Sequence, residues 1–359
     1  MERPWPAVAA PAQHAAFPCW RLGSPGQDVG DGLGTRLASS FLEVWQASPR
    51  SVRRTPVTVR PPCGIVISMT TASPPSIARS RSVVIPGRVL VGLFALAVAL
   101  VAAFVFAPRT LAASSSGGGF AEKRNLIEAV RRAFVEYWAS GERGFPPGLE
   151  RVVDYWFRYH VAKAVIAAIL LVVLSALGTL LCRAFLRAAD IGLGGRVALA
   201  SACALVSMLV LFSLLIVMAN IQGAVAPFAS ILPMLAVGPM DGELANTLDH
   251  VKQRLSDFPG PGHQNPPALE VMVSEFSQFH VALAVLAAIV AVVFVGMSAV
   301  LWKGYAGTGS SDGRTRRLLG SFGVLSGLFM LVMIVLAVAN ETTAADPAPA
   351  LLAFFEGGW

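Results

Sequence analysis

Two histidines and two asparagines are the residues of this sequence best placed to do chemistry. His160 and His280 stand at the same end of two long apolar segments. Asn220 and Asn340 stand at the corresponding end of the segments that follow them. At one membrane level these groups would form an outer polar ring that could bind an ion or ligand, and facing imidazoles could ligate a metal or haem iron. The alternative is that the four side chains bind no ligand and only hydrogen-bond to the backbone or to lipid headgroups. We favour this interpretation and expect no metal and no cofactor.

Other reactive side chains point to no further site. Cys19 and Cys63 lie near the N-terminus, whereas Cys182 and Cys203 lie in apolar segments, and no CxxC pair occurs. A zinc ribbon or thioredoxin-like centre is therefore not expected. We expect the cysteines of apolar segments to act as small hydrophobic side chains. Lys163, one turn into its apolar segment, is expected to extend its ammonium group to the membrane surface.

The overall charge and the missing motifs exclude several classes of function. The sequence contains neither a GxxxxGK[ST] phosphate loop nor an HExxH zinc motif, which favours a protein that is not an enzyme. The net charge is +7 and the pI is about 9.7. No basic helix with interleaved aromatic residues accompanies that charge, so we expect no nucleic acid partner.

Long apolar segments carry all of these candidate residues. Only 14% of the residues are charged and 55% are hydrophobic, whereas soluble domains have about 25% charged residues. A helix crosses the hydrocarbon core of about 30 Å with some 20 residues. The sequence therefore predicts an all-α membrane protein with five transmembrane helices at Val89–Ala107, Tyr159–Cys182, Val197–Ala219, Phe279–Trp302 and Leu318–Ala339.

Two short basic loops predict the orientation. The loop at 183–196 holds three arginines, and the loop at 303–317 holds one lysine and three arginines. Such loops stay in the cytoplasm, which puts the N-terminus inside and the C-terminus outside the plasma membrane. The loop at 220–278 is then extracytoplasmic and is rich in acidic residues. The segment at 108–158 fits less well, because it carries several arginines on the outer side.

The chain repeats itself after a shift of 120 residues. The ten residues from His160 match the ten from His280 at eight positions, and Pro146-Pro147 matches Pro266-Pro267. We interpret residues 120–238 and 240–356 as two copies of one unit, each with an outer segment and two spans. Two spans per unit give both copies the same orientation. The prediction is a parallel-repeat four-helix bundle with the first span peripheral, unlike the inverted repeats of many transporters.

Shorter segments flank the spans. Residues 125–138 have an apolar stripe, so we predict an amphipathic helix that either lies in the membrane interface or packs on the outer mouth of the bundle. The segments at 224–238 and 344–355 are apolar but interrupted by proline and too short to cross, and we interpret them as interfacial or re-entrant.

The N-terminal region predicts two further alternatives. Residues 1–82 have the composition of a disordered basic tail, and translation starts either at Met1 or at Met69, which would leave residues 1–68 untranslated. Residues 83–108 form a transmembrane anchor or a signal sequence, with an acceptable cleavage site at Thr110-Leu111-Ala112. The length of the apolar run favours the anchor.

The sequence resembles the uncharacterised multi-pass membrane proteins of high-GC actinobacteria. The resemblance covers about residues 85–359 and is carried by Asp154-Tyr-Trp-Phe-Arg-Tyr-His160, by Ala219-Asn220-Ile-Gln-Gly and by four lysines against 24 arginines. It implies no activity. We expect a non-enzymatic scaffold or accessory subunit of the cell envelope, with the lipid bilayer, a membrane protein or a second copy as partner. The alternative is a small transporter or channel built from the duplicated two-span unit.

Overall fold

The computed structural model describes residues 87–113, 119–187, 192–258 and 265–358. Within these ranges the regular secondary structure is helical, without strands. The tail at 1–82 and the choice between Met1 and Met69 lie outside the described residues. The elements in chain order are α2 (Gly87–Ala113), η1 (Gly119–Ala121), α3 (Lys123–Ser140), α4 (Pro147–Arg187), α5 (Leu193–Val225), α6 (Pro227–Ile231), η2 (Leu232–Ala236), α7 (Gly242–Ser256), α8 (Pro267–Gly307), α9 (Gly313–Ala345) and α10 (Pro347–Phe355).

Five of these helices have the length and composition of membrane spans. In the described part of the chain, α2, α4, α5, α8 and α9 are long and apolar enough to span a bilayer. Large apolar side chains cover their outward faces, such as Phe106 at 73% exposure and Val292 at 71%. Faces of this kind are stable against lipid and would be unstable against water. The chain is therefore an all-α, multi-pass integral membrane protein.

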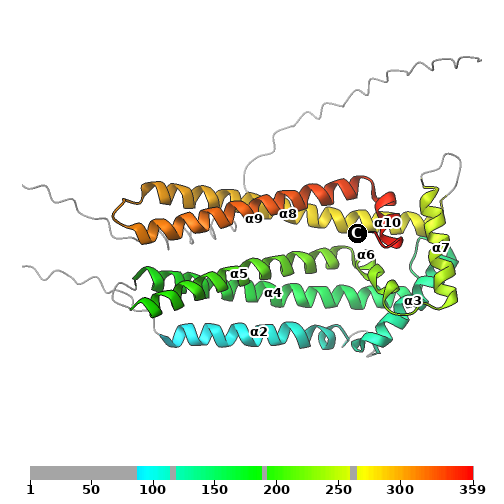
Figure 1. Ribbon diagram of the computed structural model, residues 1–359. Coiled ribbons are helices and arrows are strands. Elements are labelled where there is room, and N and C mark those ends of the chain that lie inside the picture. The colour runs from blue at the N-terminus through cyan, green and yellow to red at the C-terminus, as the bar shows by residue number, and fades with distance from the viewer. Residues whose placement is uncertain (1–86, 114–118, 188–191, 259–264, 359) are drawn as a thin grey trace, which may run out of the picture. The chain divides into compact units, whose positions relative to one another are not determined.

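The spanning helices pair as two hairpins. Helix α4 packs along α5, helix α8 packs along α9, and α5 meets α8 between the hairpins (Figure 1). Helix α2 packs on α4 through a cluster that includes Ala97, Leu170 and Leu174. Serine hydroxyls tie each hairpin: Ser213 donates to the carbonyl of Ala167 in the first. In the second, Ser326 donates to the carbonyl of Phe294 and Ser277 to that of Ala344.

Helices α4 and α8 are longer than a membrane is thick. Each has 41 residues, which makes about 60 Å at 1.5 Å per residue, roughly twice the hydrocarbon core. Both begin at the second residue of a Pro-Pro pair, where a proline costs no hydrogen bond. Their N-terminal turns therefore continue beyond the lipid as part of a separate folded layer.

We call this layer the cap: α3, α6, η2, α7, α10 and the N-terminal turns of α4 and α8. It contains the largest cluster of buried apolar residues in the described chain. The predicted amphipathic helix is α3, and its stripe, including Leu126, Phe134 and Tyr137, is buried in the cap. The segments that we interpreted as interfacial or re-entrant also belong to this core, because Phe228 and Leu351 are buried there.

The turns into the cap are the same in both hairpins. Ala226 and Asp346, each directly before a proline, have φ and ψ of −128° and 72° and of −132° and 73°. Proline excludes the helical conformation from the preceding residue. Helices α5 and α9 therefore end, and α6 and α10 begin at Pro227 and Pro347 in a new direction.

The expectation that Cys182 and Cys203 act as separate small hydrophobes was wrong. They form a disulfide between α4 and α5, with their Cα atoms 5.6 Å apart. The hairpin brings together two positions that lie 21 residues apart in the sequence. At positions 120 residues later, the indole of Trp302 lies on Gly323, where a Cβ atom would come within 3.2 Å of the ring. The two hairpins thus close the end away from the cap by different means.

Candidate functional site

The predicted site residues meet as pairs inside each hairpin. The Nδ1 atom of His160 on α4 lies 3.2 Å from Oδ1 of Asn220 on α5. The amide nitrogen of Asn220 donates to the carbonyl of Ile216 at 2.7 Å, so the amide oxygen faces the ring. Since this oxygen can only accept, we assign the imidazole proton to Nδ1. The side chains therefore connect α4 to α5 with a directed hydrogen bond.

The second hairpin repeats this arrangement. The Nδ1 atom of His280 on α8 lies 2.8 Å from Oδ1 of Asn340 on α9. The amide nitrogen of Asn340 donates to the carbonyl of Leu336 at 2.8 Å. We call these two His–Asn pairs the clamps. The four residues are thus brought together two by two, and the described residues show no hydrogen bond between the clamps.

An aromatic ring packs against each clamp histidine. Trp156, one helical turn before His160, meets it edge to face with the centroids 4.9 Å apart. Phe276 does the same to His280 at 4.6 Å. The spacing of four residues brings side chains together on one helix face, so the sequence contained this signal. Only the pairing with asparagine required the structure.

The first clamp is packed more tightly than the second. The His160 ring lies on Gly223, where a Cβ atom would come within 2.7 Å of Cε1 and Nδ1. The Nε2 atom of His160 is buried and has no hydrogen-bond partner in the described chain. The position 120 residues after Gly223 is Thr343, whose hydroxyl bonds to the carbonyl of Ala339. Gly223 is thus required by the close approach of the ring.

Gln222 connects the two hairpins, and sequence analysis missed it. Its side-chain amide donates to the carbonyl of Phe279 on α8 at 3.0 Å. The residue is 6% exposed, and a buried amide without a partner would cost free energy. Gln222 therefore fixes α5 against the helix that carries the second clamp.

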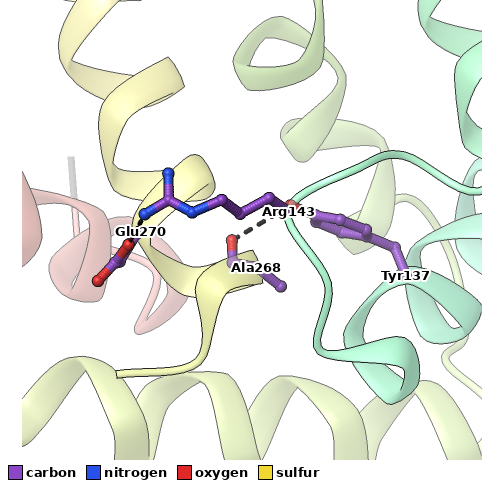
Figure 2. Close-up of polar contacts among 4 residues, drawn as sticks. All are labelled: Tyr137, Arg143, Ala268 and Glu270. Atoms are coloured by element: carbon purple, nitrogen blue, oxygen red, sulfur yellow. Dashed lines mark hydrogen bonds and ion pairs between the residues drawn. The ribbon is translucent and has the colours of Figure 1, made fainter. Parts of the chain in front are cut away.

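Figure 2 shows a polar link between the two halves of the cap. Arg143, in the loop after α3, forms an ion pair with Glu270 in the first turns of α8. The hydroxyl of Tyr137 on α3 donates to the carbonyl of Ala268 at 3.4 Å. Burial, with a smaller effect from Glu275, raises the pKa of Tyr137 to about 12. The phenol therefore stays neutral at physiological pH and can donate.

Arg131 makes a further contact of this kind. Its guanidinium donates to the carbonyls of Pro239, Val237 and Leu235 at 2.8, 2.6 and 3.3 Å. These oxygens belong to the last turn of η2 and to the residues that follow it, where backbone carbonyls need donors from outside the helix. One side chain on α3 therefore fixes the path of the chain from α6 towards α7.

The turn before α9 has the residue spacing of a hydrolase nucleophile motif but not the strand-to-helix structure in which that motif occurs. Gly309-Ser-Ser-Asp-Gly313 has the spacing GxSxG, but it joins two helices, whereas the nucleophile elbow joins a strand to a helix. Asp312 instead caps α9 by accepting from the amide of Thr315. Hydrogen bonds from Thr315 hold the pKa of Asp312 below its usual range.

The described residues contain no group of three His, Cys, Asp or Glu side chains that could hold a metal ion. Comparison of the chain with protein-family models, curated proteins and solved structures finds no match. The functional argument therefore starts from the clamps and the cap.

Proposed function

We propose that this protein is a non-enzymatic scaffold or accessory subunit of the cell envelope, located in the plasma membrane of an actinobacterium. The observation that carries the proposal is the cap. Both halves of the chain contribute to one buried core there, and α3 contacts α7 within it. A folded layer on top of the spans is what a protein needs to present a defined surface to a partner.

The proposed orientation places the cap outside the cell. The C-terminal end of α4 and the N-terminal end of α9 lie away from the cap and carry Arg183, Arg187, Arg314, Arg316 and Arg317. Basic residues flanking spans favour the cytoplasm. Alkaline phosphatase fused after Phe355 should be active, and the same enzyme inserted at Ser310 should be inactive. The reverse pattern would invert the topology.

We infer that the two halves arose by duplication of one unit. The helices α4 and α8 begin at positions 147 and 267, α5 and α9 at 193 and 313, and α6 and α10 at 227 and 347. Each difference is 120, and each clamp joins residues 60 positions apart. Apolar composition alone does not explain hydrogen-bonded side chains in register.

The partner surface that we propose is the exposed face of α7. Glu243, Asn246, His250 and Gln253 lie along this helix and are exposed, whereas Leu244, Leu248 and Val251 on its other face are buried. The helix is held from below by the cap core, so its polar face is presented rigidly. Such a face binds a protein partner through hydrogen bonds and charge complementarity.

Purification from native membranes in mild detergent tests the scaffold proposal. A membrane-protein partner should co-purify with the wild type and should be lost in Asn246→Arg. The matched control Ser310→Arg changes an exposed residue at the opposite end and should keep the partner. Purification of the chain alone would contradict the proposal. Solute flux into proteoliposomes that His160→Ala plus His280→Ala abolishes would replace it with a transporter.

A further inference from the structure

A small cavity opens where α2, η1, α3 and α4 meet. Its volume is about 170 Å³. Its lining comes from these four elements and from Met234 of η2, and it includes Arg109, Phe120, Lys123, Tyr155 and Tyr159. The two cations, Arg109 and Lys123, belong to neither the clamps nor the cap core, and both are exposed.

The cavity is positively charged. Arg109 and Lys123 form no ion pair with the described residues, and no lining residue is acidic. Arg109 and the phenol of Tyr155 line the same cavity. A third cation, Lys163, has its ammonium group 5.2 Å from the centre of the Tyr159 ring. An anion at the mouth would therefore meet Arg109 and Lys123.

The wall of the cavity is aromatic. Trp156 and Tyr159 stack with their centroids 4.9 Å apart, and Phe120 meets Tyr155 edge to face at 5.5 Å. Aromatic side chains with a polar edge gather at the level of lipid headgroups. Phe106, one turn before Arg109 on α2, is 73% exposed on the lipid-facing surface. The mouth of the cavity therefore lies where the span leaves the hydrocarbon.

We propose that this cavity binds the phosphate headgroup of an anionic phospholipid from the leaflet on the cap side. Its volume equals that of about five or six water molecules, which suits a phosphate with part of a glycerol. Pockets for whole drug-sized molecules are larger, from about 300 Å³. The cations hold the phosphate, the aromatic wall contacts the glycerol region, and the acyl chains lie along the exposed face of α2.

The second half of the chain lacks the site. The positions 120 residues after Tyr155, Tyr159 and Lys163 are Glu275, Phe279 and Leu283. This replaces a phenol by a carboxylate, removes a hydroxyl and removes a cation. Helix α2, which supplies Arg109, has no counterpart between the halves. The protein therefore binds one such lipid, beside α2.

Native mass spectrometry tests the proposal. The full chain in detergent is mixed with phosphatidylglycerol, phosphatidylcholine or inorganic phosphate, and the bound species are measured. The wild type should retain one phosphatidylglycerol in preference to phosphatidylcholine. Arg109→Gln plus Lys123→Gln should weaken retention at least about tenfold, because charge-assisted hydrogen bonds are lost. The matched control Arg132→Gln plus Arg151→Gln removes the same charge from the neighbouring cavity and should retain the lipid.

Three results would overturn the assignment. Equal retention of phosphatidylcholine would show an apolar groove without headgroup recognition. Binding of inorganic phosphate without retention of phosphatidylglycerol would make the site one for a soluble anion. An equal loss of phosphatidylglycerol in both double variants would show that the lipid responds to overall surface charge and not to this cavity. If the first double variant does not fold, the single variant Lys123→Gln replaces it, because Lys123 is exposed in the first turn of α3. Unchanged retention of phosphatidylglycerol in Lys123→Gln would then contradict the proposal.

Discussion

Gly223→Ala should destabilise the protein through the first clamp. The new methyl group would lie 2.7 Å from two atoms of the His160 ring and 2.8 Å from a third, well inside van der Waals contact. The ring has to move, and overpacking of this kind costs about 1–3 kcal/mol. Loss of the bond to Asn220 adds about 1 kcal/mol. The expected total is roughly 2–4 kcal/mol.

Thermal unfolding in detergent, followed by fluorescence-detected size exclusion, measures this loss as a fall in Tm of about 5–10 °C. The matched control is Gly327→Ala on α9, where no side chain or distant backbone atom lies within 4 Å of the new methyl group; its Tm should stay within about 2 °C. In a His160→Ala background the ring is gone, so Gly223→Ala should have almost no effect. An equal fall in Tm in both backgrounds would refute the role of the ring.

Three further predictions concern the cap and the hairpin ends. Tyr137→Phe should cost about 1 kcal/mol by removing the bond to Ala268, read as a lower Tm. Because the folded-state pKa of Tyr137 is raised to about 12, its contribution is present below pH 10 and is lost as the pH rises towards 12, so the difference between wild type and variant should shrink over that range. Arg131→Ala should lower Tm more than Arg131→Lys, since three carbonyls lose their donor; equal effects would contradict the contacts. Non-reducing peptide mapping should recover Cys182 joined to Cys203, and Cys182→Ser plus Cys203→Ser should cost about 3 kcal/mol.

The spans could be predicted from the sequence because lipid imposes a simple rule. A chain in hydrocarbon must satisfy its own backbone, so apolar length alone indicates a helix. All five predicted spans lie inside the observed helices. Their ends could not be predicted, since α4 and α8 continue towards Pro147 and Pro267 through turns whose apolar residues face a protein core. Hydropathy does not distinguish that core from lipid.

The clamps were predicted only in part. The positions of His160 and His280 in corresponding segments indicated a common role, and the asparagines stood at the matching level. Whether the four side chains form one ring or two pairs depends on which helices pack together, and that is decided by non-local contacts such as Ser213 with Ala167. The disulfide escaped prediction for the same reason, because its cysteines meet only after the hairpin has formed.

The position of the clamps explains how the spans orient the cap. In each hairpin the asparagine lies five residues before the end of its helix, and the proline of the next helix follows two residues after that end. The clamp fixes how far α5 and α9 slide along α4 and α8, while the proline fixes the direction that the chain then takes. A slip of one residue would move the next helix by about 1.5 Å, which a close-packed core does not absorb. Asn220→Ala and Asn340→Ala should therefore disorder α6 and α10 before the spans unfold. Faster amide hydrogen exchange in α6 and α10, with unchanged protection in the middle of α5 and α9, is the expected result; uniform loss of protection along the hairpins would contradict this coupling.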